Sequence, residues 1–111
     1  MPSKGEVKAA IHAASMPKTV TVTVTGGVTR VSVAIDDLHV QRQPGQSNWT
    51  GTRTLGSGRH KLIWEVIGPP DTTYTLTLSG DTRSWSFPGK TLKSGPYKGA
   101  DLGSKSFEVK E

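Results

Sequence analysis

Apolar and polar residues alternate along most of the chain, and the clearest alternation lies in its first third. Valine and threonine exchange places over residues 19–25, and a second alternating run covers residues 28–35. Strict alternation is typical of a half-buried β-strand, whose successive side chains point to opposite faces. Gly26 and Gly27 separate the two runs, and paired glycines suit the positive φ angles of a two-residue hairpin turn. We therefore predict a β-hairpin over residues 19–35.

The register of this hairpin follows from the faces of its two strands. If Thr25 pairs with Val28, the valines of both strands lie on one face, whereas a slip of one residue scatters them. The predicted cross-strand pairs are Val24 with Thr29, Val22 with Val31, and Val20 with Val33.

Shorter alternating segments predict further strands at 38–42, 47–55, 60–67, 72–79, 83–87 and 107–109. Turn residues separate them, including Asp36 and Asp37, Pro44 and Gly45, and the 56–58 and 68–71 segments. Residues 6–15 fit a first strand by their alternation, while their alanines favour a helix; we prefer the strand. The faces shared by apolar residues predict a core made of Val20, Val22, Val24, Val31, Val33, Leu62, Trp64, Val66, Leu76 and Leu78.

Residues 88–104 interrupt this pattern with glycine, lysine, serine and proline, and Tyr97 is their one tyrosine. We expect a long loop there, the most mobile part of the domain, because little buried surface offsets its ordering entropy. A short strand inside the segment is the alternative. The chain has no internal repeat and no second zone of composition, so residues 1–111 form a single domain.

Composition agrees with an all-β fold and removes several kinds of chemistry. The chain has 13 Gly and 7 Pro, 32% hydrophobic residues and no cysteine. Disulfides, thiolate catalysis and cysteine-bound zinc are therefore excluded. No stretch approaches the roughly 20 apolar residues of a membrane span. The N-terminal residues do not fit a signal peptide, because Lys4, Glu6 and Lys8 interrupt any apolar run.

The segment Leu55-Gly56-Ser57-Gly58-Arg59-His60-Lys61-Leu62-Ile63-Trp64-Glu65-Val66 resembles a recurring segment of bacterial immunoglobulin-like domains. Pro69-Pro70-Asp71 and residues 74–78 resemble the hairpin that follows it in those domains. The resemblance covers about a third of the chain and implies an immunoglobulin-like antiparallel β-sandwich of about seven to nine short strands. It also implies a secreted or surface-associated accessory module, and it carries no catalytic residues.

The charged and nucleophilic residues show no catalytic or metal-binding pattern. His12, His39 and His60 lack ligand spacing, and we assign Asp36 and Asp37 to a turn rather than to half of a metal site. No serine lies in a Gly-x-Ser-x-Gly elbow. The net charge is +5, but the basic residues are scattered along the chain, which argues against nucleic acid as a partner. We expect a domain that is not an enzyme and holds neither metal nor cofactor.

Tryptophans with polar neighbours are the remaining candidates for a binding site. Trp49 and Trp85 either pack in the core, as tryptophans in strands commonly do, or offer flat rings to a sugar. In the second case Arg53 and Arg83 are hydrogen-bond donors beside them, and Tyr97 is a further candidate. The sequence therefore predicts a non-catalytic binding module for carbohydrate or a cell-surface polymer. The alternative is a structural or protein-interaction domain, a spacer or an oligomerisation unit, that docks through its sheet edges.

Overall fold

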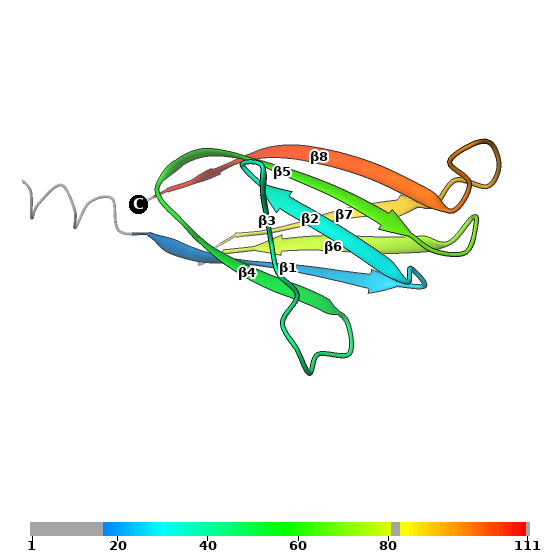
Figure 1. Cartoon of the computed structure of the whole chain (residues 1–111). Coiled ribbons are helices and arrows are strands. Elements are labelled where there is room, and N and C mark those ends of the chain that lie inside the picture. The colour runs from blue at the N-terminus through cyan, green and yellow to red at the C-terminus, as the bar shows by residue number, and fades with distance from the viewer. Residues whose placement is uncertain (1–16, 81–82, 111) are drawn as a thin grey trace, which may run out of the picture.

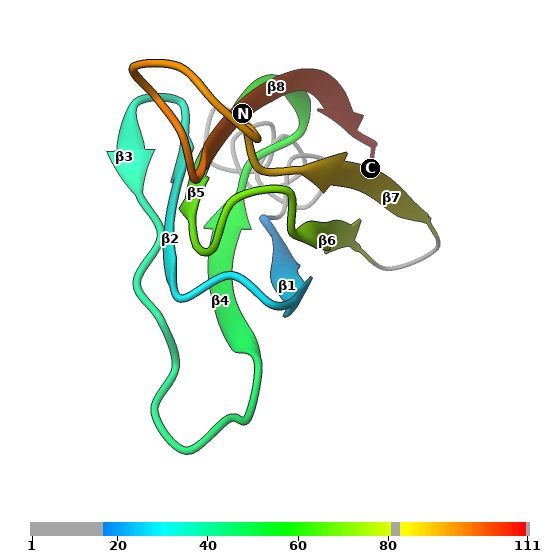
Figure 2. The ribbon, with the colours of Figure 1, turned by 90° about the vertical axis from the view of Figure 1, so that its right-hand side faces the viewer.

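The structure, a computed structural model, describes residues 17–80 and 83–110, and all regular secondary structure in this part is β-strand. Its strands are β1 (Lys18–Gly26), β2 (Arg30–Ile35), β3 (Leu38–His39), β4 (Trp49–Leu55), β5 (Gly58–Ile67), β6 (Thr73–Ser79), β7 (Ser84–Lys90) and β8 (Ala100–Val109). They form two antiparallel four-stranded sheets, in the orders β4-β1-β6-β7 and β3-β2-β5-β8. Figure 1 shows the strands running along the molecule, and Figure 2 shows the two sheets as layers. The expected strand over residues 6–15 lies outside the described residues.

The core lies between the two sheets and is built from their inward-facing side chains. Val22, Leu76 and Leu78 of one sheet and Val33, Leu62 and Val66 of the other are each at most 1% exposed. Nine of the ten residues predicted for the core are buried, and the tenth, Val31, is partly buried and packs against them. Alternation thus identified the buried faces of β1, β2, β5 and β6 correctly.

The predicted hairpin over residues 19–35 is wrong. β1 pairs with β4 and β6, whereas β2 pairs with β3 and β5, so the two strands lie in different sheets. Their valines do share the core, but they meet across it from opposite layers. A side chain at Gly26, where φ is 123°, would collide with the Thr73 carbonyl oxygen 2.5 Å from the Cβ position. The glycine therefore allows the chain to turn close to β6 as it crosses between sheets.

Most connections cross from one sheet to the other. Among the eight described strands, only β2 and β3, and β6 and β7, are both consecutive and paired. The 56–58 segment, predicted as a turn, also joins strands of different sheets, because β4 pairs with β1 and β5 pairs with β2 and β8. A short glycine-rich segment fits a hairpin turn within one sheet as well as a crossing between two sheets. The sequence of the segment by itself therefore does not distinguish the two.

The turn at Asp36 and Asp37 is confirmed. Both residues have positive φ, 53° and 66°, and they join β2 to β3 with Ile35 opposite Leu38. Two successive positive φ angles are typical of a type I′ hairpin turn, which aspartate tolerates better than most residues. This hairpin is short because β3 ends at His39.

The loop expected over residues 88–104 is shorter than predicted. β7 continues through Lys90 and β8 begins at Ala100, which leaves residues 91–99. The base of this segment is held by backbone bonds from the Leu92 amide to the Ala100 carbonyl and from the Gly99 amide to the Leu92 carbonyl, each 2.9 Å long. The buried Thr91 hydroxyl also donates to the Pro69 carbonyl at 2.7 Å. High mobility therefore remains a prediction only for the tip of this loop.

Two successive hydrogen bonds connect Trp64, Tyr74 and Asp101 across the core. Trp64 Nε1 donates to the Tyr74 hydroxyl at 3.0 Å, and that hydroxyl donates to Asp101 Oδ2 at 2.6 Å. Burial, together with the bond to Asp101, raises the pKa of Tyr74 to about 12. Gly103 leaves room for the Trp64 ring, since a Cβ there would lie 2.1 Å from Trp64 Cζ2.

Candidate functional site

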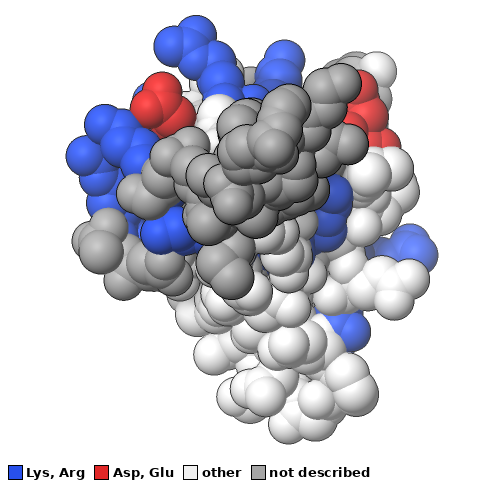
Figure 3. Space-filling view, turned by 90° about the vertical axis from the view of Figure 1, so that its left-hand side faces the viewer, with Lys and Arg blue, Asp and Glu red and all other residues white. Residues whose placement is uncertain are grey.

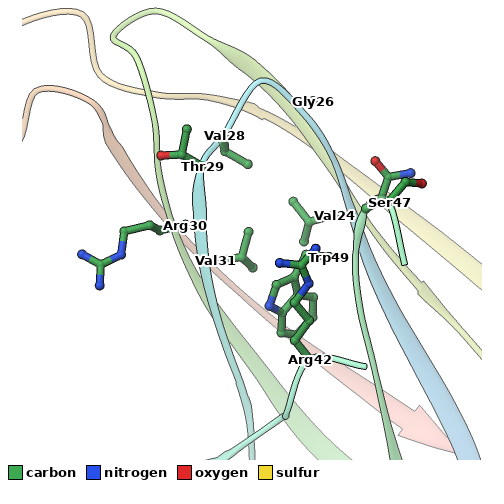
Figure 4. A pocket seen from close by; sticks show the side chains of 10 residues that line it. Val24, Gly26, Val28, Thr29, Arg30, Val31, Arg42, Ser47 and Trp49 are labelled. Carbon is green, nitrogen blue, oxygen red and sulfur yellow. The ribbon is translucent and has the colours of Figure 1, made fainter. Parts of the chain in front are cut away.

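A groove of about 420 Å³ opens at the side of the sandwich where β4 lies in one sheet and β2 in the other. Figure 4 shows it beneath the connection from β1 to β2. Its apolar wall comes from both layers, because Val24 belongs to β1 and Val31 to β2. The full lining comprises Val24, Gly26, Val28, Thr29, Arg30, Val31, Arg42, Ser47, Asn48 and Trp49.

Trp49 is the one aromatic residue of this lining. It starts β4 opposite Val24, so its side chain is on the inner face of the sheet, where it is half-buried and packs against the core. The ring extends over Gly51, at which a Cβ would lie 3.2 Å from Trp49 Cη2. The indole is thus held by the protein on its inner side while it also lines the groove.

The 40–48 segment carries the polar side chains of the groove and is attached to β4. Arg42 forms a β-bridge with Gly51, and the Gln43 amide donates to the Thr50 carbonyl at 2.7 Å. The Arg42 guanidinium donates to the Gln46 carbonyl at 3.2 Å, which leaves further donors for a ligand. Figure 4 places its side chain beside Trp49, whereas Arg30 points away from the groove.

Arg53, predicted to bind ligand beside Trp49, instead connects the two sheets. It lies opposite Val20, on the inner face of β4. Its Nη1 donates to the Ile35 carbonyl at 3.0 Å and to the Leu38 carbonyl at 3.2 Å, both in the other sheet. These hydrogen bonds join the two sheets. The guanidinium of Arg53 is therefore engaged within the protein rather than turned toward a ligand.

Trp85 and Arg83 lie at the far edge of the same sheet as Trp49. Two strands, β1 and β6, separate β4 from β7. Trp85 is half-buried opposite Leu78, and its ring centre lies 6.3 Å from that of Phe107. The two tryptophans therefore do not form one continuous aromatic surface.

Tyr97 lies apart from both tryptophans, in the 91–99 loop, and is 73% exposed. The five predicted site residues thus occupy three places: the β4 edge, the β7 edge and this loop. Sequence reasoning missed Arg42, Ser47 and Asn48 as groove residues. Their signal was the loop at Pro44 and Gly45 directly before Trp49, which folds back along β4.

One titratable pair lies outside the groove. The His60 imidazole sits between Asp36 Oδ2, 2.5 Å from Nδ1, and the Gly56 carbonyl, 2.7 Å from Nε2. Burial alone would lower the pKa of His60, but the bonds to Asp36 and Gly56 outweigh it and the net direction is upward. The hydrogen bond from His60, then that from the Lys61 amide, lowers the pKa of Asp36. The pair fastens the β2–β3 turn to β5.

Charged and metal-binding side chains are the remaining groups from which a binding site can be built. Figure 3 shows separate groups of lysine and arginine side chains on one face, with acidic side chains beside some of them. Within residues 17–80 and 83–110, no group of three His, Asp or Glu side chains could hold a metal ion. The same part of the chain contains no helix long and apolar enough to cross a membrane.

Comparison with known proteins identifies no relative of this chain. No protein-family model matches it, and neither the curated proteins nor the solved structures include a significant match.

Proposed function

We propose that this domain is a non-catalytic binding module of immunoglobulin-like architecture whose groove at Trp49 holds a carbohydrate chain. The observation that carries the proposal is the composition of the groove. An indole and three valines line it beside the guanidinium, amide and hydroxyl groups of Arg42, Asn48 and Ser47. Small-molecule sites combine apolar walls with a few polar groups that orient the ligand in this way.

A sugar ring suits both parts of this lining. The C–H face of a pyranose can pack on an aromatic ring, while its hydroxyls need donors and acceptors around it. Arg42 offers donors, and Asn48 and Ser47 offer both donors and acceptors. Because Gly51 and the core hold Trp49 from within, little ordering entropy is lost on binding.

The position of the groove also supports a binding role. β1 begins at Lys18, opposite Leu55, and β8 ends at Val109, opposite Gly58. The start of β1 and the end of β8 therefore both lie beside the 56–58 connection. The groove lies at the other end of β1, around Gly26 and Val28. A ligand can therefore approach it from the end of the molecule away from Lys18 and Val109.

Docking through a sheet edge, the alternative function, is less well supported, because each edge carries a feature that opposes pairing. β3 has two residues, and the 40–43 segment covers part of β4. β7 contains Pro88. On β8, the exposed Lys105 occupies an inward register position opposite the buried Leu62. These features favour the groove over an edge as the binding surface.

The test is a titration of soluble oligosaccharides and surface polysaccharides, followed by intrinsic fluorescence and by a glycan array. We expect Trp49→Ala to abolish binding. Trp85→Ala is the matched control, since it removes another half-buried tryptophan at the opposite edge, and it should still bind. Thermal unfolding establishes that both variants are folded.

If Trp49→Ala fails to fold, Arg42→Ala and Asn48→Ala provide the same test without disturbing the core. Both residues are exposed, and both should weaken binding while leaving the midpoint of unfolding nearly unchanged. The proposal is overturned if no saccharide binds the wild-type domain, or if Trp85→Ala loses binding as completely as the folded groove variants.

A further inference from the structure

The outer face of the β3-β2-β5-β8 sheet exposes a cluster of apolar side chains. Ile63 and Ile67 of β5 are 37% and 38% exposed, and Leu102 of β8 is 69% exposed. Leu102 lies opposite Glu65 of β5. On the outer face of β5, where every second side chain points outward, Glu65 lies between Ile63 and Ile67. Diagonal neighbours of this kind are within reach of each other, so the three side chains form one patch.

The opposite outer face of the molecule is different. On the β4-β1-β6-β7 sheet, almost every outward position carries a hydroxyl side chain. The central rows are Thr52, Thr21, Ser79 and Ser84, then Thr50, Thr23, Thr77 and Ser86. No large exposed hydrophobic residue of the described chain lies on that face. Single exposed apolar residues need no explanation, but three grouped on one of the two outer faces are typical of an interaction surface.

A hollow of about 260 Å³ lies beside the patch. It is lined by Arg30, Ser32, Glu65 and Ile67 on the outer side of β2 and β5, together with Val31. Figure 4 shows the Arg30 side chain directed away from the groove of Trp49, toward this outer side. In the described part of the chain, neither Arg30 nor Glu65 forms an ion pair. The face thus carries a projecting leucine, a hollow, and an unpaired charge of each sign.

These features are self-complementary, and we propose that the surface binds a second copy of this chain about a two-fold axis. In such an isologous contact, Leu102 of each copy enters the hollow of the other. Arg30 of one copy then approaches Glu65 of its partner, so both charges are neutralised while the isoleucines around them lose contact with water. The contact is face to face, consistent with the obstructed strand edges.

The 91–99 loop extends this surface. Leu92 and Tyr97 are both exposed on it, and Figure 2 shows the loop on the side of the β3-β2-β5-β8 sheet that faces away from the other sheet. Tyrosine is enriched in protein interfaces because it contributes a large contact area and a hydroxyl at small entropic cost. The 91–99 loop, which carries both residues, therefore lies beside the proposed contact.

The test is sedimentation velocity of the wild-type domain from micromolar to millimolar concentration, where we expect a reversible monomer–dimer equilibrium. Leu102→Lys should raise the dissociation constant at least about tenfold, since it places a charge in the hollow of the partner. Leu38→Lys is the matched control, because Leu38 is also exposed but lies on β3 at the sheet edge, and its dissociation constant should equal that of the wild type.

Charge exchange tests the two-fold pairing itself. Arg30→Glu and Glu65→Arg should each weaken the dimer, and the double variant should restore it, because the pair re-forms with opposite polarity. The inference is overturned if the wild-type domain stays monomeric at every concentration, if Leu102→Lys leaves the dimer unchanged, or if Leu38→Lys weakens it equally.

Discussion

Removal of one hydroxyl group, in Tyr74→Phe, should destabilise this domain strongly. Tyr74 is 4% exposed, and its hydroxyl is both the acceptor for Trp64 Nε1 and a donor to Asp101. Without it, the indole N–H of the buried Trp64 has no partner, and an unsatisfied buried donor costs about 1–3 kcal/mol. The partly exposed Asp101 can turn to water, so its lost hydrogen bond adds only about 1 kcal/mol.

The expected loss in the free energy of unfolding is therefore about 2–4 kcal/mol. For a domain of this size, it corresponds to a fall of roughly 10 °C in the unfolding midpoint. Urea unfolding followed by tryptophan fluorescence, with calorimetry alongside, measures both quantities. Tyr97→Phe is the matched control, because Tyr97 is 73% exposed, and it should change stability by less than about 0.5 kcal/mol.

A loss below about 0.5 kcal/mol for Tyr74→Phe, with an unchanged denaturant slope, would refute this reasoning. The same hydroxyl predicts an alkaline limit to stability. The pKa of Tyr74 is raised to about 12 in the folded state, against about 10 for an unperturbed tyrosine. The contribution of the Tyr74 hydroxyl to the free energy of unfolding is then fully present below about pH 10 and is lost as the pH rises toward about 12. The phenylalanine variant should not show that loss.

Two further variants examine other contacts of the fold. The pKa of His60 is raised and that of Asp36 is lowered. The contribution of this pair to the free energy of unfolding should therefore be greatest at about pH 5–6. It should diminish at higher pH as His60 loses its proton and at lower pH as Asp36 gains one. The stability difference between wild type and His60→Gln, from urea unfolding at several pH values, should follow this profile, and a constant difference would contradict it. Gly103→Ala should cost about 1–3 kcal/mol, because its Cβ would lie 2.1 Å from Trp64 Cζ2. The control Gly56→Ala, with no heavy atom within 4 Å, should be nearly neutral, and equal losses would exclude this clash as the cause.

Most strand positions and their buried faces were predictable from the sequence alone, because alternation depends only on the two-residue period of a β-strand. The exception is β8, of which only residues 107–109 were predicted as strand. Val22 and Val33 were therefore correctly assigned to the core before any pairing was known. The turn at Asp36 and Asp37 was predictable for a similar reason, since it depends on local backbone preferences. Of the predicted site residues, Trp49 lines the groove that we propose as the binding site.

The pairing of the strands was decided only by the tertiary structure. Val22 and Val31 face the core whether their strands lie side by side or in opposite layers, so alternation does not separate a hairpin from a crossing. The same limit applies to the site. Polar neighbours along a strand do not reveal that Arg53 reaches carbonyls of the other sheet, or that Trp49 and Trp85 lie at opposite edges. Local periodicity is a property of one segment, whereas sheet order, register and grooves depend on contacts between residues distant in the chain, where several arrangements bury the same side chains.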